Sequence, residues 1–231
     1  YVQEQLMNIL IIGPGNSPTK FGGFFLSRAK QDGHKIKTLS HGVGIVTPDS
    51  SYANFKDPED FKLKIQGLLQ DIDRIDLFLY NSNGGGGINS SHQFTAGHLV
   101  DVEGWVDSAH IHGICLNLAV SASLTKMDNR SSAVFLSSSA SYLINRDNYL
   151  QHASYFGFKG IQNQMMRGYA EYNDKGVSFS VFAPHIPYED SETAEKVMSN
   201  LYDRAINLRK EDNGKIIQFY PPEGNPHYHD K

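Results

Sequence analysis

The chain has 231 residues, 39% of them hydrophobic, and a formal net charge of -4, which is typical of one globular α/β domain with a substantial core. The sequence contains no apolar run near the ~20 residues of a membrane-spanning helix, and the acidic balance argues against general nucleic-acid binding. Its single cysteine, Cys115, excludes an intramolecular disulfide and a cysteine-based zinc site. We therefore expect a cytoplasmic protein without a metal site, in which Cys115 is a buried structural thiol.

Short apolar segments alternate with helical patterns along the whole chain. This order predicts an α/β fold: a Rossmann-like, doubly wound parallel sheet in three α/β/α layers, formed by a single domain over residues 8–224. We interpret residues 1–7 as a leader or tag remnant, with Met7 as the natural start, and residues 225–231 as a C-terminal tail. Irregular loops are expected over residues 43–55 and 81–92, and a polar loop over residues 139–152. The expected strands are 8–12, 34–39, 75–80, 133–136, 177–182 and 215–220; the expected helices are 22–30, 58–71, 104–126, a long helix ending near 173, and 194–210.

The turn after the first expected strand is rich in glycine. Gly13, Gly15 and Gly22 would let the backbone approach a pyrophosphate at a helix N-terminus, with Lys20 nearby. The turn is longer than the usual Gly-x-Gly-x-x-Gly pattern and lacks its spacing. A plain tight turn is the alternative.

The end of the second expected strand distinguishes between dinucleotide cofactors. An NAD site usually has an acidic residue there, whereas this chain has Ser40 and His41, with Lys20 or Lys37 near enough to assist. These side chains suit a 2′-phosphate, so NADP is preferred over NAD; the alternative is that they are merely solvated. Farther along, the turn that begins with Asn81 and Ser82 follows the expected strand 75–80 and is expected close to the cofactor.

Tyr155 and Lys159 are four residues apart on the long expected helix and therefore share one face. A lysine ammonium one turn away stabilises a phenolate and makes the tyrosine a usable acid or base at neutral pH. The three serines 137–139 end the preceding strand and offer a hydroxyl for a carbonyl oxygen. The pattern indicates proton transfer coupled to carbonyl reduction or alcohol oxidation, with a chance surface pair as the alternative.

Taken in order, these features resemble the short-chain dehydrogenase/reductase family, of which the chain looks like a divergent member. The resemblance covers nearly the whole chain, roughly residues 8 to 224, as a series of individually weak matches. The matched segments are Asp76–Ser82, in place of the family's strand and Asn-Asn-Ala-Gly turn, Ala133–Ser138, the Tyr155 and Lys159 pair, Val177–Pro184 and Gly214–Phe219.

The resemblance implies an oxidoreductase that transfers hydride between a nicotinamide and a small-molecule carbonyl or alcohol. Tyr155 would exchange the proton, Lys159 would lower its pKa, and Ser138 would position the carbonyl, with Ser137 and Ser139 as competitors. The family also implies a homodimer or homotetramer built on the Tyr155 helix and the helix before it. The implied cofactor-binding residues are Gly13, Gly15, Lys20, Gly22, Ser40, His41, Asn54, Asn81, Ser82, Lys159 and Pro184.

The chain departs from the family at several positions. His110 stands where the family often has a proton-relay asparagine, and His185 replaces the glycine that usually follows Pro184. The alternative function is therefore a nucleotide-binding or regulatory protein that kept the fold and lost efficient catalysis. A serine hydrolase based on Ser138 is disfavoured because no Gly-x-Ser-x-Gly elbow surrounds it.

Overall fold

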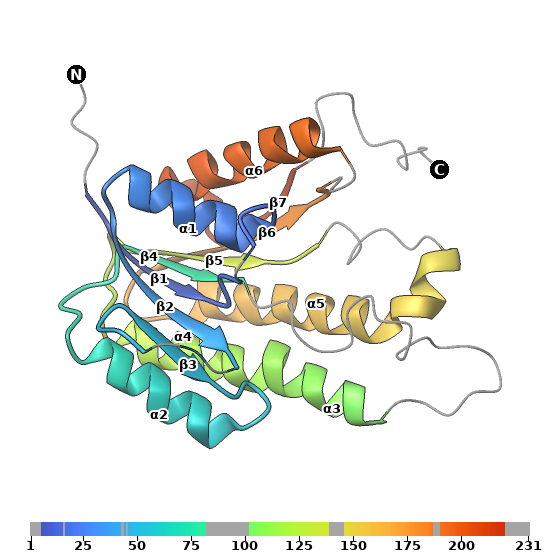
Figure 1. The fold of residues 1–231 in the computed structure, drawn as a ribbon, viewed down its shortest axis with the longest axis horizontal. Coiled ribbons are helices and arrows are strands. Elements are labelled where there is room, and N and C mark those ends of the chain that lie inside the picture. Colours follow the sequence, from blue (N-terminus) through green and yellow to red (C-terminus); the bar gives the residue numbers. More distant parts are fainter. Residues whose placement is uncertain are drawn as a thin grey trace.

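The computed structural model describes residues 6–15, 17–42, 44, 46–81, 102–138, 146–186 and 190–219; within these ranges the side chains of 102–104 and 146–156 are not described. Strands and helices alternate along the chain and form three layers, with a central sheet between two helical layers (Figure 1). The predicted α/β/α architecture is confirmed. No helix in the described part of the chain is both long and apolar enough to cross a membrane.

In the part of the chain that the structure describes, the sheet has seven strands, all parallel, in the order β3-β2-β1-β4-β5-β6-β7. The direction of strand succession reverses between β1 and β4, which places the carboxyl ends of these two strands at a topological switch point, where α/β sheets bind ligands. The strands are β1 (Asn8–Ile12), β2 (Lys35–His41), β3 (Ser50–Ala53), β4 (Leu77–Tyr80), β5 (Ser132–Leu136), β6 (Ser178–Pro184) and β7 (Ile216–Phe219).

The helices divide between the two faces of the sheet (Figure 1). Helices α1 and α6 cover one face, while α2, α4 and α5 cover the other. The helices are α1 (Phe21–Gln31), α2 (Pro58–Leu69), α3 (Val102–Ala109), α4 (Leu116–Leu124), α5 (Arg146–Tyr172) and α6 (Ser191–Ile206), with a π turn, η2 (His110–Cys115), between α3 and α4 and a 3₁₀ turn, η4 (Lys210–Asp212), before β7.

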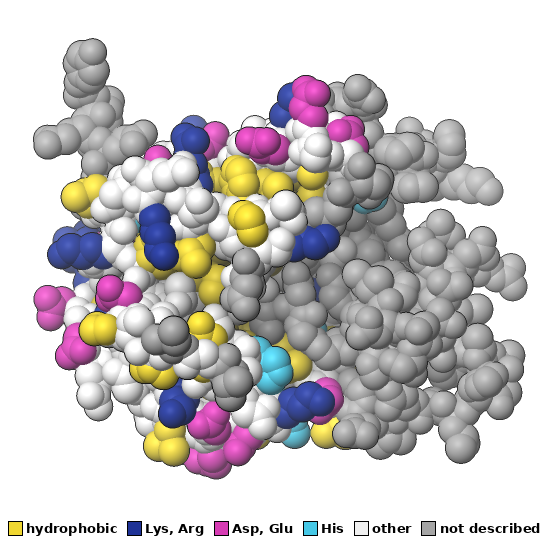
Figure 2. Space-filling view, in the orientation of Figure 1, with side chains coloured by type: hydrophobic (Ala, Val, Ile, Leu, Met, Phe, Trp, Pro, Cys, Tyr) yellow, Lys and Arg dark blue, Asp and Glu magenta, His cyan; other side chains and the backbone are white. Residues whose placement is uncertain are grey.

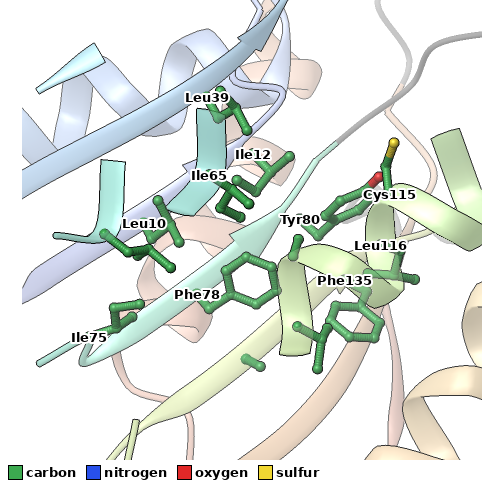
Figure 3. Packing of buried hydrophobic residues seen from close by; sticks show 14 of the residues in the cluster. Leu10, Ile12, Leu39, Ile65, Ile75, Phe78, Tyr80, Cys115, Leu116 and Phe135 are labelled. Atoms are coloured by element: carbon green, nitrogen blue, oxygen red, sulfur yellow. The ribbon is translucent and has the colours of Figure 1, made fainter. Parts of the chain in front are cut away.

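Two hydrophobic cores follow from the alternation of side chains along each strand. Leu10 and Phe78 belong to the core under α2, α4 and α5 (Figure 3), whereas their neighbours Ile11 and Leu79 belong to the core under α1 and α6. Burial on both faces explains why the central strands are continuously apolar in sequence.

Three expected boundaries were wrong. The expected loop 43–55 contains β3, which pairs with β2 from Thr38↔Ser50 to His41↔Ala53; as a short edge strand it needs no apolar run. Helix α5 begins at Arg146, so the expected loop 139–152 extends too far. Helix α6 ends at Ile206 rather than near 210, because η4 takes a separate turn in which Asp212 binds Arg204.

Charged side chains of both signs are interspersed over the face of the molecule shown in Figure 2, rather than gathered by sign. This mixture agrees with the small net charge of the chain. On this face, the described side chains therefore offer local groups for binding and not a field of one sign.

Candidate functional site

The glycine-rich turn after β1 is built for close approach between backbone segments. Gly13 and Gly15 have φ of 71° and 70°, the left-handed region that favours glycine. A Cβ atom on Gly22 would lie 2.1 Å from the Pro14 carbonyl oxygen and 2.2 Å from the Asn81 Nδ2 atom. Space beside Gly15 is open, with no atom within 4 Å of an ideal Cβ. The turn thus packs tightly against α1 at Gly22 and leaves open space beside Gly15.

Helix α1 starts without a side-chain cap. Its N-cap residue is Lys20, and its first turn has no acidic residue. In contrast, Asp57 caps α2 and Asp190 caps α6, each accepting hydrogen bonds from the backbone. The first N–H groups of α1 and the positive end of its dipole are therefore available to an anion.

Asn81 lies at the switch point immediately after β4 and is 5% exposed. Its backbone N–H donates to Ile12 O at 2.8 Å, and its Nδ2 donates to Gly13 O at 2.7 Å. These bonds fix the side chain, yet its Oδ1 is buried and has no hydrogen-bond partner among the described residues. A ligand donor in the crevice would satisfy this acceptor. Ser82 lies outside the described residues.

His41 ends β2 and is exposed, while Ser40 is half-buried. The Nδ1 atom of His41 accepts a hydrogen bond from the Phe55 N–H at 3.1 Å, so the neutral ring carries its proton on Nε2 and offers a donor there. Asn54 is exposed next to this edge, and its Oδ1 accepts from Lys56 N–H. Lys37 lies four positions before His41, ~13 Å back along the strand, and donates to Pro48 O. The structure thus places Ser40, His41 and Asn54 at the carboxyl edge and Lys37 away from it.

A hollow of about 1000 Å³ runs along the flank formed by β2 and β3. It extends from Pro14 and Gly15, beside the glycine-rich turn, past Ser40 to Asn8 and His34 at the amino ends of β1 and β2. The hollow gives the turn after β1 and the end of β2 a common solvent space.

Lys159 is fully buried on α5, and its Nζ donates to the carbonyl oxygen of Leu136, the last residue of β5, at 2.8 Å. Burial disfavours the ammonium and lowers the pKa of Lys159 to about 7. A buried amine that exchanges its proton near neutral pH therefore lies at the carboxyl end of the sheet. Such perturbed groups are concentrated at functional sites.

The serines after β5 differ in accessibility. Ser137 is 3% exposed and its N–H donates to Phe182 O, whereas Ser138 is half-buried. Only Ser138 of these two is accessible enough to meet a ligand. Ser139 lies outside the described residues. Tyr155 lies on α5 one turn before Lys159, and its side chain is among those not described.

The structure brings His112 to α5. The buried His112 ring stacks on Phe158 with a centroid distance of 6.4 Å and an interplanar angle of 22°. The half-buried His110 lies two positions earlier, and its Nδ1 atom is buried with no hydrogen-bond partner among the described residues. The spacing before Gly113 predicted a role for His110, whereas the π turn that carries His112 has no simple sequence signal.

Three further residues singled out in the sequence, Pro184, His185 and Cys115, are held by core or backbone contacts. Pro184 is buried at the end of β6, and His185 N–H donates to Phe219 O at 2.9 Å. Burial raises the pKa of Cys115 to about 12, and its thiol donates to Phe55 O, which confirms the expected structural thiol. Among the described residues, no three His, Cys, Asp or Glu side chains are grouped as metal ligands would be.

Solved structures with the same fold are numerous, although neither a family model nor a curated protein sequence matches the chain. An oxidoreductase of the short-chain dehydrogenase/reductase family from Brucella ovis, in complex with a partially ordered NAD, gives a TM-score of 0.72 at 13% identity, over 93% of this chain and 99% of that one. A short-chain dehydrogenase/reductase from Serratia marcescens gives 0.71 at 10% identity, over 93% and 95%. A short chain dehydrogenase family protein from Francisella tularensis gives 0.68 at 12%, over 94% and 98%. The chain therefore has the short-chain dehydrogenase/reductase fold.

Proposed function

We propose that the chain is a divergent short-chain dehydrogenase/reductase, an oxidoreductase that uses a nicotinamide cofactor and acts on a small-molecule carbonyl or alcohol. The observation that carries the proposal is Lys159: a fully buried amine, anchored at the end of β5 beside Ser137 and Ser138, and one helical turn from Tyr155. A chance surface pair of tyrosine and lysine would not bury the lysine there.

The roles follow from these positions. Tyr155 gives or takes the proton at the substrate oxygen, and Lys159 stabilises its phenolate. Ser138, the accessible serine, donates to the substrate oxygen, while Ser137 stays within the fold. The bound nicotinamide would supply the hydride. His110, half-buried on the π turn η2, keeps the proton-relay role that the family resemblance implies.

The residues at the switch point fit such a cofactor. The uncapped N-terminus of α1 and the open side of Gly15 suit a pyrophosphate, and the unsatisfied Oδ1 of Asn81 offers an acceptor in the crevice. We also assign Gly13, Lys20 and Gly22, in or next to the glycine-rich turn, to the cofactor site. Asn54, Ser82 and Pro184 are the further residues assigned to the cofactor.

We propose NADP rather than NAD. The Nε2–H of His41 and the Ser40 hydroxyl are donors at the end of β2, where an NAD site usually has a carboxylate. The adjoining hollow leaves room for a 2′-phosphate. A fluorescence titration with NADPH and NADH tests the choice: tighter binding of NADH would contradict it.

The helix face formed by α3, η2 and α5 supports a homodimer or homotetramer. Four large apolar side chains on it are 39–47% exposed: Trp105, Val106, Ile114 and Ile161. Trp105 packs edge-on against Phe158, which joins α3 to α5 in one surface. A cytoplasmic location is proposed from the single cysteine, which needs no oxidising environment.

Tyr155→Phe is the test of the reaction. The variant should lose roughly 10²–10⁴-fold in kcat on any carbonyl that the wild type reduces, because general acid–base catalysis contributes that much. Binding of NADPH should be unchanged. Tyr172→Phe is the matched control, since Tyr172 lies on the same helix and is 85% exposed. Equal rates in wild type and Tyr155→Phe would refute the assignment.

The second candidate is a nucleotide-binding protein with little or no catalysis. It is favoured by the stretched turn between Gly15 and Gly22 and by His185, which occupies space that a glycine would leave beside Pro184. Tight NADPH binding without turnover on a broad carbonyl panel would establish it.

A further inference from the structure

The helix that faces α5 is interrupted by the π turn η2, His110–Cys115. Such turns are rare and are frequently found at functional sites. The N–H of Leu116 donates to Gly113 O, and the carbonyl of Ile111 accepts the hydroxyl of Tyr80. A side chain from the sheet therefore stabilises the first part of the turn.

The position of the Tyr80 hydroxyl is set by the core and not by the helix. Tyr80 is the last residue of β4 and is fully buried. Its ring contacts those of Phe78 and Phe135, each with a centroid distance of 6.4 Å. Figure 3 shows the ring extending from β4 toward the helix that carries Cys115 and Leu116. The packing of the ring in the core thus fixes the position of the donor independently of the turn.

The turn determines which residues face α5. Ser108 and His112 are one turn apart, both fully buried, and His112 stacks on Phe158, the residue before Lys159. One turn farther along α5, Gln162 is also fully buried, and neither its amide nitrogen nor its amide oxygen has a hydrogen-bond partner. Buried polar atoms without partners are uncommon and call for an explanation. Here they mark a polar interface beside the buried amine.

We propose that Tyr80 is a positioning residue: its hydroxyl, through the Ile111 carbonyl, holds the π turn and thereby keeps the polar face of Ser108 and His112 against α5 beside Lys159. The expected effect of Tyr80 on turnover rests on the proposed oxidoreductase function. A π turn shifts the register of a helix by one residue, which is a rotation of about 100°. Losing the turn would therefore rotate His112 out of its stack on Phe158.

Tyr80→Phe tests the proposal, because it removes the hydroxyl and keeps the ring in the core. The imidazole signals of His112 should shift in a heteronuclear NMR spectrum, and amide exchange across residues 110–116 should accelerate. In a carbonyl reduction assay kcat should fall about tenfold with KM unchanged, because the variant alters how the site is aligned and not what it binds.

Tyr169→Phe is the matched control. The Tyr169 hydroxyl donates to Asn117 Oδ1 at 2.6 Å and so links α5 to α4 just beyond the C-terminal end of the π turn, without contacting the Ile111 carbonyl. It should leave the His112 signals and kcat as in wild type. Unchanged His112 signals in Tyr80→Phe, or an equal loss of kcat in both variants, would overturn the proposal. If the wild type reduces no carbonyl, the proposed function fails, and the NMR and exchange data still decide the role of Tyr80.

Discussion

The burial of Lys159 has a measurable consequence for the pH dependence of stability. Burial lowers the pKa of this amine from an ordinary 10.5 to about 7. Between these two values the unfolded chain holds a proton at Lys159 that the folded chain has released. The free energy of unfolding should therefore rise with pH across this window, by ~1.4 kcal/mol per pH unit at most, and should be independent of this group below pH 7.

Lys159→Met should remove that rise. Urea unfolding at pH 7, 8, 9 and 10 would compare the two proteins, and the wild type should gain stability relative to the variant at each step. The variant also leaves the Leu136 carbonyl without its donor, a loss that does not depend on pH. Lys64→Met, at an exposed position of α2, should keep the wild-type pH dependence. Parallel stability curves for wild type and Lys159→Met would contradict the low pKa.

The structure also distinguishes residues that are equivalent site candidates in the sequence. The serines at 137 and 138 are adjacent and identical, yet strand β5 buries the first and leaves the second accessible. Likewise, of His110 and His112, the structure shows His112 stacked on a ring of α5, that of Phe158. Both outcomes depend on the neighbouring elements and not on the residues themselves.

At the scale of elements, the contact between α1 and the turn after β1 depends on the absence of a side chain at Gly22. The Pro14 carbonyl and the Asn81 amide occupy the space that a Cβ would need. Gly22→Ala should therefore push α1 from the turn, destabilise the protein by ~1–3 kcal/mol and weaken NADPH binding. Denaturant unfolding and a fluorescence titration measure the two effects.

Gly67→Ala supplies the matched control for this prediction. Gly67 lies inside α2, and an added Cβ would meet no atom within 4 Å. Because alanine is the better helix former, the control should be more stable than wild type by ~0.5–1 kcal/mol, with NADPH binding unchanged. If Gly22→Ala behaved in the same way, the close packing at the turn would not matter.

At the scale of the whole molecule, the exposed apolar face of α3, η2 and α5 predicts self-association. Ile161 is 45% exposed on α5. Ile161→Glu should convert the proposed dimer or tetramer to smaller species, because a charge cannot be buried in an apolar interface without a partner. Size-exclusion chromatography with light scattering would measure the mass.

Leu63→Glu serves as the control for the oligomer, since Leu63 is 67% exposed on α2, outside this face. It should leave the mass unchanged. A monomeric wild type, or the same loss of mass in both variants, would count against this face as the interface.

The sequence by itself determined the α/β class, the parallel sheet and the approximate position of most elements, because continuous apolar strands and capped helices are local patterns. It also determined that Tyr155 and Lys159 share a helix face. Only the tertiary structure showed that β3 exists, because this strand has no apolar run and is defined by its pairing with β2. It also showed that Lys159 is buried at the end of β5. It likewise decided the π turn and the orientation of His112, because Tyr80 and Ile111 meet only after β4 and the helix have packed together. Local patterns are set by neighbours along the chain, whereas burial and orientation are set by elements that are distant in sequence.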